Sequence, residues 1–429
     1  MEQLKRSDKI VAQMGKIAGN RYITAIRNGM SVVIPVTIIG SFFIIVLNLP
    51  IAGWESVIAP YATSLRLPMH VTIDLMSIYV CIGITISLCD EYGIDRASTS
   101  VLAVLSFLMA AVTPATISTE QSAAVGLTIT GTVLPLTNLG ANGLFTAMVL
   151  SIATVELVRF CIAKKWVIKM PAGVPPAVIH SFVALIPGTL LIISTWVLKV
   201  VLHFDLNSTL QWLFSPIRYF AGDSFLAVIM PILLITIVWL FGIHGMILAK
   251  PLLTPFWFAH LNDNMNAAAA NEPIPHFLTE QFFQWFVWIG GAGATLALAL
   301  LMAVVGMSAF CKKIGRFTLV PSLFNINEPL IFGVPLVMNP FLAIPFILAP
   351  LVMGTTTYLA MVVFNIVDYP IAIVPWTLPA PLGAMLATGM DWRAAVLALG
   401  NLALAVLIYY PFFKRFDQKL LSKEIKTRD

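Results

Sequence analysis

Long apolar runs recur along the whole 429-residue chain, and no other feature limits its possible folds as strongly. A helix that crosses a bilayer needs about 20 mostly apolar residues. Runs that meet this criterion lie near residues 30–49, 72–89, 98–115, 143–163, 177–202, 224–249, 285–310, 340–364 and 393–413. A further run near 370–388 is interrupted by Pro375, Pro379 and Pro381. The pattern predicts an all-α polytopic membrane protein with about ten transmembrane helices.

Composition excludes the soluble alternatives. Apolar residues make up 59% of the chain and charged residues 10%, whereas soluble domains hold about 45–50% and about 25%. So little polar surface cannot cover a water-soluble body, and the lipid bilayer must be the main partner. The net charge of +5 sits in short runs beside apolar segments, which argues against nucleic-acid binding. Cys81, Cys89, Cys161 and Cys311 form no C-x-x-C motif, so we expect small buried side chains, with no disulfide and no metal site.

Basic residues gather at both ends of the chain. Residues 1–28 interleave basic with apolar residues, as an amphipathic helix on an anionic membrane surface does, and residues 414–429 form a basic tail. Because basic residues are retained on the cytoplasmic side, both termini are predicted to be cytoplasmic. The cluster of Lys312, Lys313 and Arg316 falls on the opposite side by the same count, unless residues 251–280 cross the membrane. The sequence leaves that conflict open.

Two stretches, residues 251–281 and 317–340, fit neither a spanning helix nor an ordinary loop. Both are punctuated by prolines, which interrupt an α-helix. Backbone groups freed at membrane depth are tolerated where they are buried in protein or line a wet cavity. We therefore predict two re-entrant hairpins beside a substrate site, with kinked ordinary helices as the alternative. Both stretches contain Asn-Glu-Pro, at 271–273 and 327–329, and a true repeat and a coincidence both remain open.

Ionisable side chains within apolar segments are costly and mark candidate functional sites. Glu328 is the strongest candidate, because no basic residue lies between Arg316 and Arg393 to neutralise it. Asn325 and Asn327 beside it supply donors and acceptors that suit a hydroxyl-rich ligand.

Other polar and aromatic residues in apolar segments allow two interpretations. His244 lies next to Gly245, where a ligand can approach closely, but a packing histidine is the alternative. Trp239 and Trp376 suit either interfacial anchoring or a stacking platform for sugar rings. Elsewhere, we expect Glu156 to pair with Arg159 on one helix face. Lys199 is expected to extend toward the membrane surface.

A long motif carries a resemblance to a known family. From Asn325 to Pro340 the sequence reads NINEPLIFGVPLVMNP, and it resembles the membrane component, enzyme IIC, of bacterial sugar phosphotransferase systems. It is most similar to the lactose, cellobiose and diacetylchitobiose family. The segment from Trp239 to Gly245, the segment 140–145 (GANGLF) and the basic N-terminus are similar too.

The resemblance implies a homodimer in the bacterial cytoplasmic (inner) membrane, with ten spans and two re-entrant hairpins per subunit. It implies that residues 29–223 form the dimer-interface half and that residues 224–413 form the substrate-binding half, with hairpins near 251–281 and 317–340. Family members bind one disaccharide through residues that match Glu328, His244, Trp239 and Trp376. Asn327 and Gln281 are further candidates by their placement.

The chemistry implied is vectorial phosphorylation, with no cofactor in this chain. A phosphocysteine on a separate enzyme IIB, itself supplied by IIA, HPr and enzyme I, phosphorylates the 6-hydroxyl of the sugar. Such a transfer needs an oriented hydroxyl and relief of its proton. Glu328 is the expected acceptor and catalytic base, and His244 is expected to orient the same sugar end. The chain alone is expected to bind and translocate a β-linked disaccharide without catalysing phosphorylation.

Two alternatives belong to other classes. An ion-coupled secondary sugar transporter would also explain a carboxylate within the membrane, and it would import unmodified sugar. A membrane-embedded transferase acting on lipid-linked sugars would turn over without a soluble phosphoprotein. The isolated Glu328 within its motif and the lack of a second paired carboxylate weigh against both.

Overall fold

The computed structural model describes residues 19–47, 49, 51, 53–117, 131–168, 170–171, 176–217, 221–241, 244–334, 336 and 340–426. Residues 1–18 of the predicted amphipathic segment 1–28 therefore lie outside the described residues. The chain divides into two compact units. One comprises residues 1–18, 38–67 and 216–429, which we call the C-terminal unit; the other comprises residues 19–37 and 68–215, the N-terminal unit.

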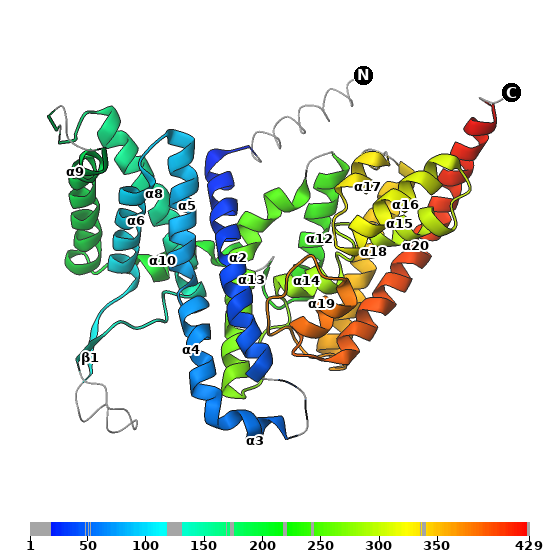
Figure 1. Cartoon of the computed structure of the whole chain (residues 1–429), viewed down its shortest axis with the longest axis horizontal. Helices are drawn as coiled ribbons and strands as arrows, with labels where there is room; N and C mark the ends of the chain where they lie inside the picture. Colours follow the sequence, from blue (N-terminus) through cyan, green and yellow to red (C-terminus); the bar gives the residue numbers. More distant parts are fainter. Residues whose placement is uncertain are drawn as a thin grey trace. The chain divides into compact units, whose positions relative to one another are not determined.

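Three packed helices form the centre of the N-terminal unit (Figure 1): α5 (Met76–Tyr92), α6 (Arg96–Ala111) and α8 (Leu144–Ala163). Helix α5 ends at Gly93, whose φ of 65° supplies the left-handed conformation that closes a helix. Helix α6 begins where the Asp95 side chain accepts a hydrogen bond from the backbone of Ser98. Both capping interactions are local in sequence.

Further elements surround this centre. They are the first part of α2 (Arg21–Leu47), the end of α4 (Ala62–Thr72), the strands β1 (Ala115–Ile117) and β2 (Gly131–Val133), η2 (Ala141–Gly143), α9 (Pro176–Trp196), the π-helical η3 (Val197–Val201), α10 (Leu206–Phe214) and the first residue of η4 (Ser215–Ile217). The two strands pair antiparallel, with Ala115 opposite Val133 and Ile117 opposite Gly131.

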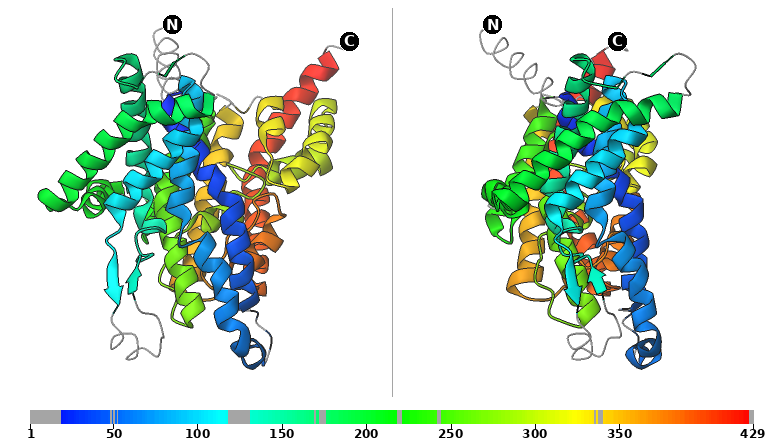
Figure 2. Two further views of the ribbon diagram at one scale, coloured as in Figure 1. Left: turned by 60° about the vertical axis from the view of Figure 1, so that its left-hand side comes forward. Right: turned by 90° about the vertical axis from the view of Figure 1, so that its left-hand side faces the viewer.

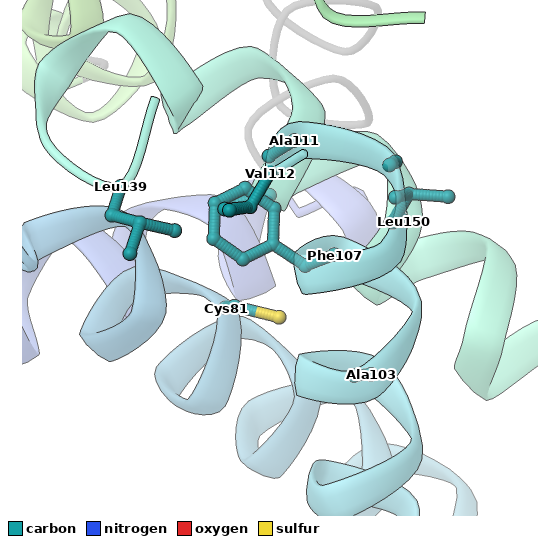
Figure 3. Packing of buried hydrophobic residues seen from close by; sticks show 9 residues of the cluster. Cys81, Ala103, Phe107, Ala111, Val112, Leu139 and Leu150 are labelled. Atoms are coloured by element: carbon teal, nitrogen blue, oxygen red, sulfur yellow. The ribbon is translucent and has the colours of Figure 1, made fainter. Parts of the chain in front are cut away.

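Small and aromatic side chains fill the core between these helices. Figure 3 shows the Phe107 ring pointing toward Leu139, with Cys81 nearby on α5. Cys81 and Phe107 are fully buried, and all four cysteines of the chain are buried and free of disulfides, as predicted. Burial of such apolar side chains contributes about 25 cal/mol per Å² removed from water.

Two ionisable residues of the N-terminal unit have structural partners. Arg159 donates to Glu156 at 2.6 and 2.9 Å, which confirms the predicted pair. The Nζ of Lys199 donates to the carbonyls of Met109 and Val112, at 2.9 and 2.5 Å. Its extension toward the membrane surface stays a prediction. Those carbonyls lie at the C-terminal end of α6, where a cation is stabilised by the helix dipole.

Two long helices dominate the C-terminal unit, and Figure 2 shows them from two further directions: α18 (Pro340–Tyr358), which continues as the π-helical η5 (Leu359–Val363), and α20 (Trp392–Lys426). Besides the end of α2, the start of α4 and most of η4, this unit contains α3 (Trp54–Ile58), η1 (Ala59–Tyr61), α12 (Phe225–Leu240), α13 (Gly245–Ala270), α14 (Glu280–Phe286), α15 (Leu296–Val304), α16 (Ala309–Leu323), α17 (Glu328–Gly333) and α19 (Ala380–Ala387).

Three expectations about helix continuity are wrong. Residues 224–249 are not one helix, because α12 ends at Leu240 and α13 begins at Gly245. Residues 285–310 are not one helix either, because residues 287–295 form turns between α14 and α15. Conversely, α13 continues through Pro251 and Pro255, which were expected to break it. Each of these prolines removes one backbone donor inside α13, and both side chains are buried, so packing around the helix offsets the loss.

Six helices of the described residues are long and apolar enough to cross a membrane: Arg21–Leu47, Ser56–Tyr92, Ala141–Ala163, Phe182–Val201, Phe341–Val363 and Trp392–Lys426. Shorter apolar helices, Arg96–Ala111 and Phe225–Leu240, accompany them. The all-α character is thereby confirmed. The expected number of ten crossings, the two re-entrant hairpins and the roles of the two halves stay predictions.

A buried asparagine ties three elements of the C-terminal unit together. Asn401 on α20 donates to the carbonyl of Phe286 and to the hydroxyl of Thr357, both at 2.9 Å. Its side-chain oxygen accepts from the Thr356 hydroxyl at 2.6 Å. Asn401 is 1% exposed, so any partner it lost would remain buried without a hydrogen bond.

Replacing Asn401 by alanine is expected to destabilise the protein by about 1–3 kcal/mol, because buried polar groups of α14 and α18 lose their partner. Thermal unfolding in detergent, followed by size-exclusion fluorescence, measures the effect. Gly400→Ala is the matched control: no side chain lies within 4 Å of the added methyl group, and it should leave the unfolding temperature unchanged or raise it. Equal unfolding temperatures for the two variants would contradict the prediction.

Candidate functional site

The predicted site residues come from five places in the C-terminal unit. Trp239 lies near the end of α12, and His244 immediately precedes the first turn of α13. Glu328 opens α17, directly after Asn327. The two remaining candidates are Gln281 on α14 and Trp376 in the irregular segment 364–379.

The structure brings Glu328 and His244 together although they are far apart in sequence. The His244 Nε2 and Glu328 Oε1 atoms are 3.6 Å apart, and the two side chains are 33% and 46% exposed. This distance is longer than a hydrogen bond, so both groups keep capacity for a further partner. Among the described residues, the buried Nδ1 of His244 also has no hydrogen-bond partner. A carboxylate and an imidazole converging at a half-exposed position suit recognition of a hydroxyl group.

Trp239 packs against the histidine of this pair. Its ring centroid lies 4.4 Å from that of His244 at an interplanar angle of 44°, and 6.1 Å from that of Phe332. Trp239 is only 2% exposed, so in this structure its ring supports His244 and presents almost no free face. Trp376, by contrast, is 47% exposed and offers a face for stacking.

The turn before Glu328 is fixed by Asn325. Asn325 has a φ of 62°, a left-handed conformation that asparagine adopts more readily than most residues. Its side-chain oxygen accepts from the backbone of Gly290 at 2.9 Å. Its amide nitrogen donates to the carbonyls of Trp376 and Leu378, at 2.8 and 2.9 Å. One side chain thus joins the turn to two separate irregular segments.

Asn327 and Gln281 are more deeply buried than a ligand-contacting role suggests. Asn327 is 4% exposed, and its amide nitrogen donates to the carbonyl of Ala292 at 3.0 Å. The Gln281 oxygen accepts from the Trp285 indole at 2.7 Å and from the backbone of Val374 at 3.4 Å. Both side chains use these atoms to hold the backbone around the site, and their predicted contact with substrate stays a prediction.

The turns at residues 287–295 pack closely against Asn327. Gly291 has a φ of 96°, and a methyl group added there would overlap the Asn327 side chain. The Tyr409 hydroxyl donates to the carbonyl of Gly293 at 2.7 Å. Sequence reasoning did not single out these turns, although the run GGAG at 290–293 is a strong signal for irregular backbone.

A second polar cluster lies elsewhere in the same unit. Ligand atoms of Asp223, His260 and His276 fall within 4.8 Å of one another, a spacing that could hold a metal ion. However, the two imidazole rings stack with centroids 4.2 Å apart and planes 11° apart. Their nitrogen lone pairs therefore lie in nearly parallel planes and do not point to one shared position. The arrangement favours a hydrogen-bonded ion-pair cluster over a metal centre.

His276 is the centre of that cluster, in the irregular segment 271–279. Its Nδ1 lies 2.5 Å from Asp223 and its Nε2 lies 3.4 Å from Asp263. Burial alone would lower the pKa of His276, but hydrogen bonds to the two carboxylates outweigh burial and raise it to about 9. The protonated ring thus links Asp263 on α13 to Asp223, two residues before α12 begins.

Comparison with known protein families decides the classification. The family model described as "Phosphotransferase system, EIIC" matches residues 27–350, about three quarters of the chain. The chain belongs to this family. The EIIC membership confirms the resemblance carried by the motif from Asn325 to Pro340.

Relatives cover nearly the whole EIIC chain. The putative permease IIC component YwbA of Bacillus subtilis (strain 168) is 38% identical, and the alignment covers 97% of this chain and 96% of YwbA. The lichenan permease IIC component of the same organism is 37% identical over 97% and 94%. The cellobiose-specific EIIC component of Geobacillus stearothermophilus is 36% identical, also over 97% and 94%.

A solved structure shares the fold. The crystal structure of ChbC, the IIC component of the N,N'-diacetylchitobiose-specific phosphotransferase system, superimposes with a TM-score of 0.87 at 33% sequence identity. The match covers 96% of this EIIC chain and 97% of ChbC. It identifies the EIIC chain as an integral, all-α membrane transporter.

The His276 cluster predicts a dependence of stability on pH. Because the pKa of His276 is raised above about 6.5, the value in an unfolded chain, its stabilising contribution is complete below about pH 6.5. The contribution is lost as the pH rises through about 9. The unfolding temperature of the purified protein should therefore fall between pH 7 and 10.

The His276→Gln variant should show a smaller fall over this pH range, because it has no proton to lose there. His203→Gln, which changes an exposed histidine outside the cluster, is the control and should behave as the wild type. A fall of the same size in the His276 variant and the wild type would contradict the assignment.

Proposed function

We propose that this EIIC chain binds a β-linked disaccharide and translocates it across the bacterial cytoplasmic membrane, where phosphorylated IIB phosphorylates the 6-hydroxyl of the sugar. The observation that carries the proposal is the convergence of Glu328 and His244 at 3.6 Å, with both side chains partly exposed. A carboxylate that accepts and an imidazole that donates or accepts can together orient one hydroxyl group.

The sugars named for the relatives support the substrate class. Relatives 34–37% identical are named for lichenan, cellobiose and oligo-β-mannosides. The solved relative is named for N,N'-diacetylchitobiose. All these sugars contain β-linked pyranose units, which present a flat apolar face with hydroxyl groups at the edge. The exposed ring of Trp376 matches such a face, and Glu328 matches the edge.

The chemistry asks two things of this chain. The sugar must be held so that its 6-hydroxyl oxygen faces the incoming phosphoryl group, and the proton of that hydroxyl must have an acceptor. Glu328 accepts a hydrogen bond from the hydroxyl and takes its proton as the new oxygen–phosphorus bond forms and the sulfur–phosphorus bond of the IIB phosphocysteine breaks, which leaves the cysteine thiolate on IIB. His244 holds the same sugar end, and Trp239 fixes the imidazole through ring packing.

The proposal also covers the phosphoryl donor, the orientation in the membrane and the oligomeric state. A lactose-specific EIICB component of Staphylococcus aureus is 30% identical, and this chain aligns with 74% of its length. Phosphorylated IIB, supplied in turn by IIA, HPr and enzyme I, is the proposed donor to the sugar bound here. We place both termini in the cytoplasm on the distribution of basic residues, and we propose a homodimer with its interface in residues 29–223.

An ion-coupled secondary sugar transporter remains the alternative in mechanism, but the comparisons give it no support. The two mechanisms differ in the form of the sugar that accumulates. Such a transporter accumulates unmodified sugar on an ion gradient, whereas the proposed function yields sugar phosphate and requires phosphorylated IIB.

Glu328→Gln tests the proposed base. In liposomes supplied with phosphorylated IIB, the rate of sugar 6-phosphate formation should fall about 10²–10⁴-fold, the range for losing a positioned proton acceptor. The matched control is Glu272→Gln, which changes the exposed glutamate of the other Asn-Glu-Pro tripeptide. Uptake that continues in the Glu328 variant, driven by an ion gradient without IIB, would overturn the proposal.

Trp376→Ala tests the stacking platform. We expect the dissociation constant for cellobiose to rise about tenfold, equivalent to about 1.4 kcal/mol, while Trp376→Phe retains most of the affinity. Isothermal titration on detergent-purified protein measures both. Trp392→Ala removes another exposed tryptophan of the same unit and serves as the control. Unchanged affinity in the Trp376→Ala variant would exclude the ring from the sugar site.

A further inference from the structure

The structure assigns Asn325 a role beyond the substrate contacts: it is the positioning residue that holds the Trp376 platform and the Glu328 turn as one recognition unit. This inference rests on the proposed function, since it concerns how the same site is assembled. Asn325 is itself 8% exposed, so it acts through the backbone segments that it joins.

The three hydrogen bonds of Asn325 span residues that no local structure connects. Gly290 belongs to the turns between α14 and α15, whereas Trp376 and Leu378 belong to the segment that precedes α19. Glu328 follows Asn325 by three residues at the start of α17. The Asn325 side chain is therefore a direct link between the backbone that carries the proposed base and the backbone that carries the platform.

The chemistry of the side chain fits this role specifically. The amide must accept from one backbone N–H and donate to two carbonyls, and asparagine supplies both an acceptor and two donors. Aspartate has nearly the same shape but would place one carboxylate oxygen against the two carbonyls. Asparagine also tolerates the φ of 62° at this position.

The platform segment needs such an anchor. Residues 364–379 contain no α-helix or strand in the described structure, and the carbonyl of Trp376 accepts from Asn325. Before the ring, the amides of Ile373 and Val374 donate to Ser41 and Gln281. Without Asn325, the part of the segment that carries the ring would have to be ordered by each sugar that binds, and that ordering reduces affinity. With Asn325 in place, the ring is presented before the sugar arrives.

Two substitutions separate the side chain from the backbone conformation. Asn325→Gly keeps the left-handed conformation without strain and removes all three hydrogen bonds. Asn325→Asp keeps the acceptor for Gly290 and removes the two donors. Asn365→Gly is the matched control, because Asn365 has a similar φ of 49° and is exposed in the same irregular segment.

The first arm of the test needs no sugar. Amide hydrogen exchange of the full-length protein in detergent should accelerate at least tenfold around residues 288–292 and 374–379 in Asn325→Gly. The Asn365→Gly variant should not show this acceleration. Unchanged exchange in both segments of Asn325→Gly would overturn the inference, whatever the protein transports.

The second arm is a double-mutant cycle on cellobiose binding. Asn325→Gly and Trp376→Ala should each raise the dissociation constant about tenfold. If Asn325 acts by presenting Trp376, the double variant should also show about a tenfold rise, and Asn325→Asp should resemble Asn325→Gly. A hundredfold rise in the double variant would mean independent effects and would contradict the inference.

The two arms distinguish failure of this inference from failure of the proposed function. A wild-type protein that binds no β-disaccharide would refute the proposed substrate class. The exchange measurement would still decide whether Asn325 holds the two segments together.

Discussion

A chain surrounded by lipid must satisfy its backbone amide and carbonyl groups internally, and in this protein that requirement falls on a few buried side chains. Regular helices meet it by themselves. The turns at 287–295 and the segment 364–379 do not. Asn325, Asn327 and Tyr409 supply hydrogen-bond partners for the turns, and Asn325 and Gln281 supply partners for the segment. Side-chain hydrogen bonds therefore hold the irregular backbone around the site in a defined conformation.

The same constraint explains where the candidate site lies. Glu328 and His244 both occupy places where a helix begins after a break, which leaves their side chains free to converge. Trp376 lies in a segment whose carbonyls are held by Asn325. Long apolar helices such as α18 and α20 supply the rigid surroundings, and Asn401 fixes them to α14. The site residues thus lie at helix N-termini and in hydrogen-bonded irregular segments, and long helices surround them.

Much of this could be predicted from the sequence. Apolar runs located helices such as α8, and the motif around Glu328 indicated the family and the principal acidic residue, because both signals are local. The pairing of Glu328 with His244 followed only from the family resemblance. The continuity of α13 through Pro251 and Pro255 was mispredicted, since neighbouring packing decides whether a helix tolerates a proline.

The structural use of Asn325 could not be read from the sequence either. Its partners are 35, 51 and 53 residues away, and nothing local marks them. An asparagine side chain can bind the hydroxyl groups of a ligand, and it can equally bind backbone carbonyls that have no partner in a helix or strand. Burial decided between these uses for the atoms described here.

The central claim is that Glu328 and His244 bind the sugar through its 6-hydroxyl. The most direct test compares the affinity of the wild-type protein for cellobiose and for its analogue lacking the 6-hydroxyl of the phosphorylated ring, by isothermal titration. Our account predicts a loss of at least tenfold for the analogue, because the carboxylate and the imidazole that face that hydroxyl lose their partner. Equal affinities would contradict it.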